Sequence, residues 1–232
     1  MLTHLIAGLK VGIEYKYPRM INQSAAYVTE LSETDFDIVL PNEIIERTHA
    51  ENPHLSKDEC EYLQTGFIFY RKLIDYNAML LHASAVVKDG YAYLFSAPSG
   101  TGKSTHTGLW LKAFPDARIL NDDKPAIRIE DGKVNVYGTP WSGKTDLNLN
   151  LCVPLGGICF LERSEKNFIN KISGAEAIPR ILNQTVRPRM MNNIDNLLGV
   201  LEKIIENTSI YRMGCNISDE AAIMAYEAMR SK

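Results

Sequence analysis

The sequence has few cysteines, and their arrangement excludes two kinds of site. Only four occur in 232 residues, at Cys60, Cys152, Cys159 and Cys215. None forms a C-x-x-C pair, and none has histidines at metal-binding spacing, so no structural zinc site is expected. Such scatter is typical of free, buried thiols in a reducing compartment.

The sequence also has no block of like charge and no long apolar run. Residues 1–16 contain no apolar core long enough for a signal peptide, and no later stretch approaches the length of a membrane span. The 25 basic and 28 acidic residues give a net charge of −3 and no basic patch for nucleic acid. We therefore expect a cytoplasmic, soluble α/β protein that binds neither a membrane nor nucleic acid.

The most informative stretch is Ser96–Thr105, with the sequence SAPSGTGKST. It lies between an apolar run typical of a strand, residues 91–95, and an amphipathic run typical of a helix, residues 106–114. A strand, a glycine-rich turn and a helix form the setting of a phosphate-binding loop. Gly100 and Gly102 would let backbone N–H groups turn toward phosphate oxygens, and the helix N-terminus would add further donors.

Each residue of this loop has an expected role. Lys103 would reach the β- and γ-phosphates, and the Ser104 hydroxyl would ligate Mg²⁺. The residues expected to bind the nucleotide are Ser99, Gly100, Thr101, Gly102, Lys103, Ser104 and Thr105. Because Ala97 replaces the first glycine of G-x-x-x-x-G-K-[ST], we expect a negative φ at that position. A chance glycine–serine turn with a solvated lysine is the weaker alternative.

The rest of the chain predicts a mixed, largely antiparallel sheet with flanking helices, because hairpins outnumber βαβ units. Strands are expected at 9–15, 25–29, 36–40, 80–87, 91–95, 118–121, 126–129, 134–137, 153–161, 168–172 and 209–213, with turns around Pro18, Asn22 and Ser32. Strands 80–87 and 91–95 should form a hairpin that turns at Asp89-Gly90. Helices are expected at 41–50, 56–76, 106–114, 173–184, 192–206 and 218–229, the second of them starting at a capping box formed by Ser56 and Glu59. Strand 168–172 is expected to pair with strand 153–161. The second helix should bury a face made of Leu63, Phe67, Tyr70 and Ile74.

Two adjacent carboxylates, Asp122 and Asp123, end a predicted strand nineteen and twenty residues after Lys103. In an open sheet such a strand end would lie beside the loop, where a metal-binding carboxylate belongs. One aspartate could bind Mg²⁺ while the other accepts the proton of an acceptor hydroxyl. The structural alternative is a solvated Asn-Asp-Asp turn.

Five further residues are weaker candidates. His82 lies on a predicted strand, where a lone histidine is more often a core or edge residue. His106 is expected to be structural or solvent-facing. Lys144 could reach a phosphate or could be an ordinary surface lysine. Arg187 and Arg189 could hold an anionic substrate, although most such loop arginines are solvated.

The order of these motifs resembles that in the C-terminal domains of HPr kinase/phosphorylases and in ATP-type phosphoenolpyruvate carboxykinases. The resemblance covers residues 80–140. The carboxykinase loop is similar to Ser99–Lys103, and the HPr kinases share the order His82, Lys103-Ser104, Asp122-Asp123. This resemblance implies an antiparallel phosphate-loop fold, makes His82 an active-site residue, and gives the aspartate pair metal-binding and acid–base roles.

Several features depart from those families. Ala97 replaces a loop glycine, and the chain is too short for a carboxykinase. Residues 1–80 do not match the N-terminal domain of HPr kinase, and its C-terminal signature has no clear copy. The chain is therefore similar to smaller HPr-kinase-related proteins, a group that includes kinases of free serine and of modified peptides.

The sequence thus predicts an ATP- and Mg²⁺-dependent kinase that acts on a hydroxyl of a small molecule, peptide or protein. The expected catalytic residues are Asp122, Asp123, His82 and Lys103; the expected metal ligands are Ser104, Asp122 and Asp123; and Lys144 would assist the loop in nucleotide binding. ADP or pyrophosphate stays possible as the donor.

The expected kinase domain is 80–232, and region 1–79 would pack on its core and could bind a substrate or partner. The resemblance also implies possible homo-oligomers. The alternative function is a nucleotide-sensing regulatory protein without turnover.

Overall fold

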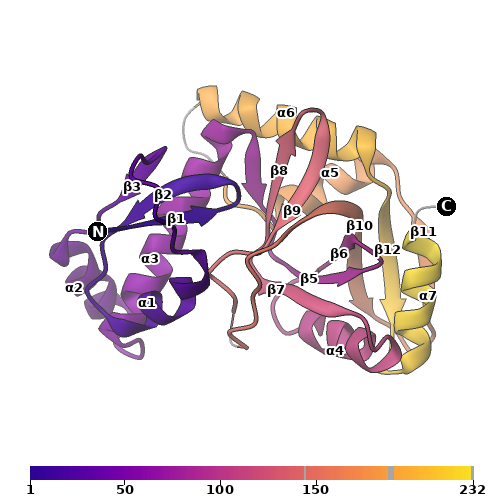
Figure 1. The fold of residues 1–232 in the computed structure, drawn as a ribbon. Helices are drawn as coiled ribbons and strands as arrows, with labels where there is room; N and C mark the ends of the chain where they lie inside the picture. Colours follow the sequence, from indigo (N-terminus) through magenta and orange to yellow (C-terminus); the bar gives the residue numbers. More distant parts are fainter. Residues whose placement is uncertain (144, 188–190, 231–232) are drawn as a thin grey trace.

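The computed structural model describes residues 1–143, 145–187 and 191–230. Within these ranges the chain is a mixed α/β protein with two sheets (Figure 1). The smaller sheet consists of β1 (Leu2–Ile6), β2 (Leu9–Ile13) and β3 (Phe36–Ile38). Strand β2 pairs antiparallel with β1 and parallel with β3.

Three helices accompany the smaller sheet: α1 (Pro18–Ser24), α2 (Asn42–Glu51) and α3 (Lys57–Lys72). The predicted capping box of α3 is confirmed, because Ser56 and Glu59 each accept a hydrogen bond from the other's backbone N–H. Two predictions nearby are wrong. The expected turn around Pro18 is a helix, since proline at the first helical position presets a helical φ. The expected strand 25–29 begins instead as the 3₁₀ turn Ala25–Tyr27.

The predicted buried face of α3 is only half correct. Leu63 and Phe67 are 39% and 45% exposed, whereas the other two expected residues are buried. The helix is oriented by the indole of Trp141, which stacks on Phe69 with ring centroids 4.8 Å apart and contacts the helix at Gly66. Trp141 is distant in sequence, so the periodicity of α3 alone could not identify this face.

The larger sheet has nine strands, and the strand that leads into the glycine loop lies inside it. Its strands are β4 (Ala78–Leu80), β5 (Ala83–Lys88), β6 (Tyr91–Ser96), β7 (Arg118–Asp123), β8 (Ala126–Glu130), β9 (Lys133–Tyr137), β10 (Cys152–Arg163), β11 (Phe168–Lys171) and β12 (Ile210–Cys215). The order is β4-β8-β9-β10-β6-β5-β7, with β12 between β10 and β11. Among the described strands of this sheet, only β10–β6 and β10–β12 are parallel pairs, which confirms the expected mixed, largely antiparallel sheet.

The expected partner of β11 is wrong. Strand β11 pairs antiparallel with β12, and not with β10. The parallel strand β12 occupies that edge of β10, with Ile158 opposite Ile210. Strand β12 begins almost 40 residues after β11 in the sequence, so the proximity of segments along the chain does not predict its position in the sheet.

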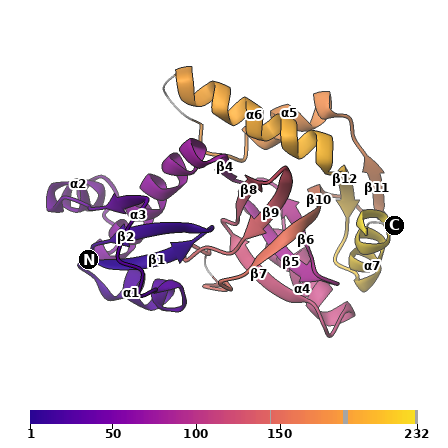
Figure 2. The same cartoon turned by 45° about the horizontal axis from the view of Figure 1, so that its top comes forward.

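Four helices cover the two faces of the larger sheet (Figure 2). They are α4 (Lys103–Ala113), α5 (Gly174–Leu182), α6 (Met191–Asn207) and α7 (Asp219–Met229). Strand β6 alternates between the faces: Leu94 packs with α5 and α6, while Tyr93 and Phe95 pack with α4 and α7. Among the residues described, no helix is both long enough and apolar enough to cross a membrane.

Two glycine-to-alanine changes should alter stability in opposite directions. A Cβ on Gly66 would lie 2.8 Å from Trp141 Cδ1, so Gly66→Ala should lower the free energy of unfolding by about 1–3 kcal/mol. Gly108 also lies inside a helix, but nothing is within 4 Å of its Cβ position, so Gly108→Ala should add about 0.5–1 kcal/mol. Denaturant unfolding measures both values. A neutral Gly66→Ala would contradict the packing of α3 on Trp141.

Candidate functional site

The glycine-rich loop, residues 97–102, connects β6 to the N-terminus of α4. Gly100 and Gly102 have φ values of 78° and 121°, a region that side chains with a Cβ rarely adopt. Nothing lies within 4 Å of a Cβ position on Gly100, so backbone conformation and not packing requires glycine there. Ala97 is buried and keeps the predicted negative φ. The loop is therefore an open turn that ends at the first residue of the helix.

Lys103 is the first residue of α4, and its side chain is turned into the protein. The residue is only 9% exposed. Its Nζ donates to the backbone oxygen of Ala97 at 3.2 Å and lies 3.1 Å from His82 Nε2. Burial lowers the pKa of Lys103, although the charges of Asp123 and Asp122 act in the opposite direction. The ammonium group is thus held in a partly desolvated position beside two carboxylates.

Asp122 lies at the end of β7 and accepts three hydroxyl hydrogen bonds. The residue is 5% exposed and lies opposite Ser84 in the β5–β7 register. Its Oδ1 accepts from Ser84 Oγ at 2.6 Å and from Ser104 Oγ at 3.0 Å, while Oδ2 accepts from Thr145 Oγ1 at 2.7 Å. These bonds fix the carboxylate next to the second residue of α4.

Asp123 pairs with His82. Its Oδ1 lies 2.9 Å from His82 Nε2, and His82 Nδ1 lies 2.8 Å from Gln184 Oε1. Burial raises the pKa of Asp123, but the hydrogen bond from His82 and the charges of Lys124 and Lys103 outweigh it and leave the pKa lowered. Asp123 also has a φ of 139°, a strained value for a residue with a Cβ and one typical of functional sites. His82 lies in the segment between β4 and β5, and not on a strand as expected.

These side chains line one cleft of about 470 Å³, which we call the polar cleft. It is lined by His82, Ser99, Gly100, Gly102, Lys103, Ser104, Thr105, Asp122, Asp123, Gly143 and Thr145. The structure therefore brings together the predicted catalytic residues from three separate segments. Within the described ranges, no cluster of three or more His, Cys, Asp or Glu side chains is suited to hold a metal ion.

Some predicted residues lie elsewhere. Thr101 lines a neighbouring cavity and not the polar cleft. Arg187 is exposed and donates to the Leu182 backbone oxygen at 3.1 Å. Lys144 and Arg189 lie outside the described residues, so their expected roles stay predictions.

The sequence reasoning missed four residues of the site: Ser84, Thr145, Gln184 and Gly143. A Cβ on Gly143, whose φ is 41°, would lie 2.7 Å from the backbone oxygen of Asp122. Gly143 therefore allows the loop that carries Thr145 to approach β7 closely. The Asp-Asp pair identifies β7 as part of a candidate site, but no local sequence pattern predicts that the segments near residues 143 and 184 lie beside that site.

The loop that carries Thr145 also contacts region 1–79. Tyr62 Oη accepts from Ser142 N–H at 2.6 Å, and Tyr27 Oη donates to Asn148 Oδ1 at 2.9 Å. Arg19 forms an ion pair with Asp146 at 3.1 Å. A single loop thus contacts both the N-terminal region and the carboxylates of the polar cleft.

Comparisons with known proteins give little beyond this geometry. No family model matches the chain, and no curated protein matches it. Among solved structures, the HPr(Ser) kinase/phosphatase from Coxiella burnetii is similar with a TM-score of 0.37 and 11% sequence identity, and the match covers 65% of this chain and 93% of that chain. A likeness this distant carries no argument about chemistry. The family that the sequence resembles therefore stays a prediction.

Acid should destabilise the protein through His106, in the first turn of α4. His106 is 2% exposed, and burial lowers its pKa to about 4. Because the unfolded chain takes up this proton near pH 6.5, stability should be lost as pH falls from 6.5 toward 4, by up to about 3 kcal/mol. Denaturant unfolding across this range should show a smaller loss in His106→Phe. His4, whose pKa burial also lowers, is common to both proteins, so parallel pH profiles would refute the assignment to His106.

Proposed function

We propose that this protein is a Mg²⁺-dependent phosphotransferase that moves the γ-phosphate of ATP to an acceptor hydroxyl. One observation carries the proposal. A glycine loop presents Lys103 and Ser104 at a helix N-terminus, and the same cleft contains Asp122, Asp123 and His82. Phosphoryl transfer needs few groups: a phosphate cradle, a divalent cation, positive charge and a group that takes the acceptor's proton.

The loop and Lys103 would bind the phosphates. The N-terminus of α4 favours anions through its N–H groups and its dipole. Among the described residues, the polar partners of Lys103 Nζ are the uncharged Ala97 oxygen and the His82 ring. A buried ammonium that lacks a direct carboxylate partner is stabilised when phosphate oxygens approach it.

Ser104 and Asp122 would hold the Mg²⁺. Their side chains are in contact, at 3.0 Å, and the hydroxyls of Ser84 and Thr145 orient the carboxylate. This small donor set fits Mg²⁺, which takes few protein ligands and binds mainly to phosphate and water oxygens. When bound, the ion would neutralise charge on the nucleotide phosphates.

Asp123 would accept the proton of the acceptor hydroxyl. Its lowered pKa keeps it ionised at neutral pH, as a proton acceptor must be. His82 Nε2 contacts Asp123 Oδ1, and Gln184 orients the His82 ring through Nδ1. His82 would therefore stabilise the ionised form of Asp123 through this hydrogen bond.

We further propose that residues 80–232 bind the nucleotide and that residues 1–79 help to bind the acceptor or a partner. The contacts of Tyr62, Tyr27 and Arg19 with the Thr145 loop support this assignment. The acceptor would be a hydroxyl of a small molecule, a peptide or a protein. A cytoplasmic location and self-association stay predictions.

Lys103→Met should weaken binding of Mg-ATP by about tenfold to a hundredfold, because a charge-assisted hydrogen bond to phosphate is lost. Isothermal titration calorimetry measures the affinity. Lys112→Met is the matched control: Lys112 lies on the same helix but is exposed and pairs with Asp219 at 2.8 Å. Equal affinities in the two variants would contradict the role of Lys103.

Asp123→Asn should lower turnover by at least about a hundredfold while the affinity for Mg-ATP changes little, because only proton transfer is removed. Transfer of labelled γ-phosphate to free serine, threonine, peptides and small proteins provides the assay, with the exposed Asp116→Asn as control. If the wild-type protein binds Mg-ATP but forms no product across this screen, the nucleotide-sensing function without turnover replaces the proposed one.

A further inference from the structure

Helices α5 and α6 lie side by side on the face of the larger sheet opposite α4 (Figure 2). Between them is a groove of about 720 Å³, which we call the helix groove. It is lined by Ile178, Asp195, Leu198, Gly199, Leu201, Glu202, Ile205 and Glu206.

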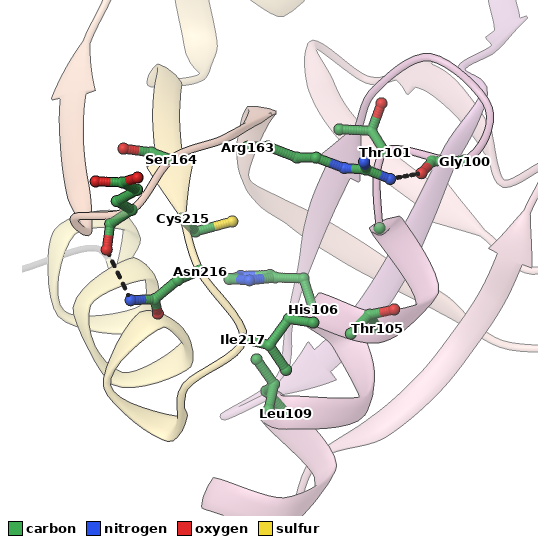
Figure 3. A pocket seen from close by; sticks show the side chains of 12 residues that line it. Gly100, Thr101, Thr105, His106, Leu109, Arg163, Ser164, Cys215, Asn216 and Ile217 are labelled. Carbon is green, nitrogen blue, oxygen red and sulfur yellow. Dashed lines mark hydrogen bonds between the residues drawn. The ribbon is translucent and has the colours of Figure 1, made fainter.

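The helix groove is separate from the proposed nucleotide and acceptor site. A cavity of about 600 Å³ beside the glycine loop shares Gly100, Gly102 and Thr105 with the polar cleft, so it belongs to the site already described (Figure 3). The helix groove shares no residue with either of these spaces. A molecule bound in the helix groove would therefore leave the polar cleft open.

We propose that the helix groove binds an amphipathic, basic α-helix of another protein. This inference goes beyond the proposed function and does not depend on it. An amphipathic helix binds to such a groove by laying its apolar face between the two helices that form the walls.

The groove offers apolar surface that the described chain leaves uncovered. Leu198 of α6 is 48% exposed, and Ile178 of α5 is 37% exposed. Leu201, at the base of the groove, is buried in the core beneath both helices. Exposed apolar side chains that gather in one hollow with a polar rim are typical of protein interaction sites.

The shape of α6 allows a second helix to approach closely. Asp195, Leu198, Gly199 and Glu202 form one stripe of α6, at positions i, i+3, i+4 and i+7. Nothing lies within 4 Å of a Cβ position on Gly199, so no contact among the described residues requires glycine there. A glycine inside a helix costs about 0.5–1 kcal/mol relative to alanine. The missing side chain would shorten the distance between α6 and a docked helix.

The charge of the groove favours a basic partner. Three acidic residues line it, and no lysine or arginine among the described residues does. Glu206 pairs with Lys203 at 2.7 Å, whereas Asp195 and Glu202 form no ion pair within the described part of the chain. Lysine and arginine side chains of a docked helix would pair with these two carboxylates, and an acidic helix would be repelled.

Fluorescence anisotropy with the full chain tests the charge of the partner. The probe is a labelled helical peptide of about 18 residues, with leucine at i, i+3, i+4 and i+7 and lysine elsewhere. Its twin carries glutamate in place of lysine. At physiological ionic strength we expect the lysine probe to bind with a Kd on the order of 10 μM, at least about tenfold more tightly than its twin.

Variants of α6 locate the binding site. Gly199→Arg fills the groove and adds a positive charge, so it should weaken the lysine probe at least about tenfold. Because arginine favours helices, denaturant unfolding should show no loss of stability in this variant. Gly199→Ala keeps the groove open and should change the affinity by less than about twofold. Leu198→Ser, which removes apolar contact without adding charge, should weaken the probe about fivefold.

Ile223→Arg is the control for net charge. Ile223 lies on α7, is 43% exposed and does not line the groove, so this variant should bind the lysine probe like the wild type. No binding of the lysine probe, equal binding of the two probes, or equal weakening by Gly199→Arg and Ile223→Arg would overturn the inference.

Sedimentation equilibrium of the chain alone tests for a different occupant. We expect Gly199→Arg to leave the mass of the wild-type species unchanged. An oligomer that Gly199→Arg dissociates would make a second copy of this chain the occupant and would also overturn the inference. The titration of Mg-ATP against Lys103→Met tests the proposed function separately, so the two can fail independently.

Discussion

The register between β5 and its two neighbours is the constraint on which the whole site depends. Ala83 lies opposite Ser96 of β6 on one side and opposite Asp123 of β7 on the other. The end of β6, which leads into the glycine loop, therefore lies level with the end of β7, which carries the carboxylates. A slip of one residue would turn the β7 side chains to the other face and remove Asp122 from Ser104.

Opposing electrostatic effects act on the charges that this register gathers. Burial disfavours the charged form of Lys103, and it would disfavour that of Asp123 if His82, Lys124 and Lys103 did not reverse the shift. The pKa values of Lys103 and Asp123 are both lowered, so the surroundings disfavour the charged form of the lysine and favour that of the aspartate. An anion in the polar cleft would stabilise the charged form of Lys103, because its negative charge would replace the solvation that burial removes.

Local patterns in the sequence predicted local structure well. The capping box at Ser56, the hairpin through Asp89-Gly90 and the glycine turn before α4 all depend on residues close together in the chain. The strand order around β12 and the buried face of α3 depend on distant partners, so the first prediction was wrong and the second only half correct. For the same reason Thr145 and Gln184 were missed, although the Asp-Asp pair they support was identified from its spacing. What these residues bind stays a prediction.

The contacts of the Thr145 loop have a consequence for communication within the molecule. Tyr62 and Tyr27 hold the loop from one side, while Thr145 donates to Asp122 from the other. A molecule that displaced these tyrosines would also withdraw one of the three hydroxyl donors from Asp122. The N-terminal region could then change the hydrogen bonding of Asp122 without entering the cleft itself.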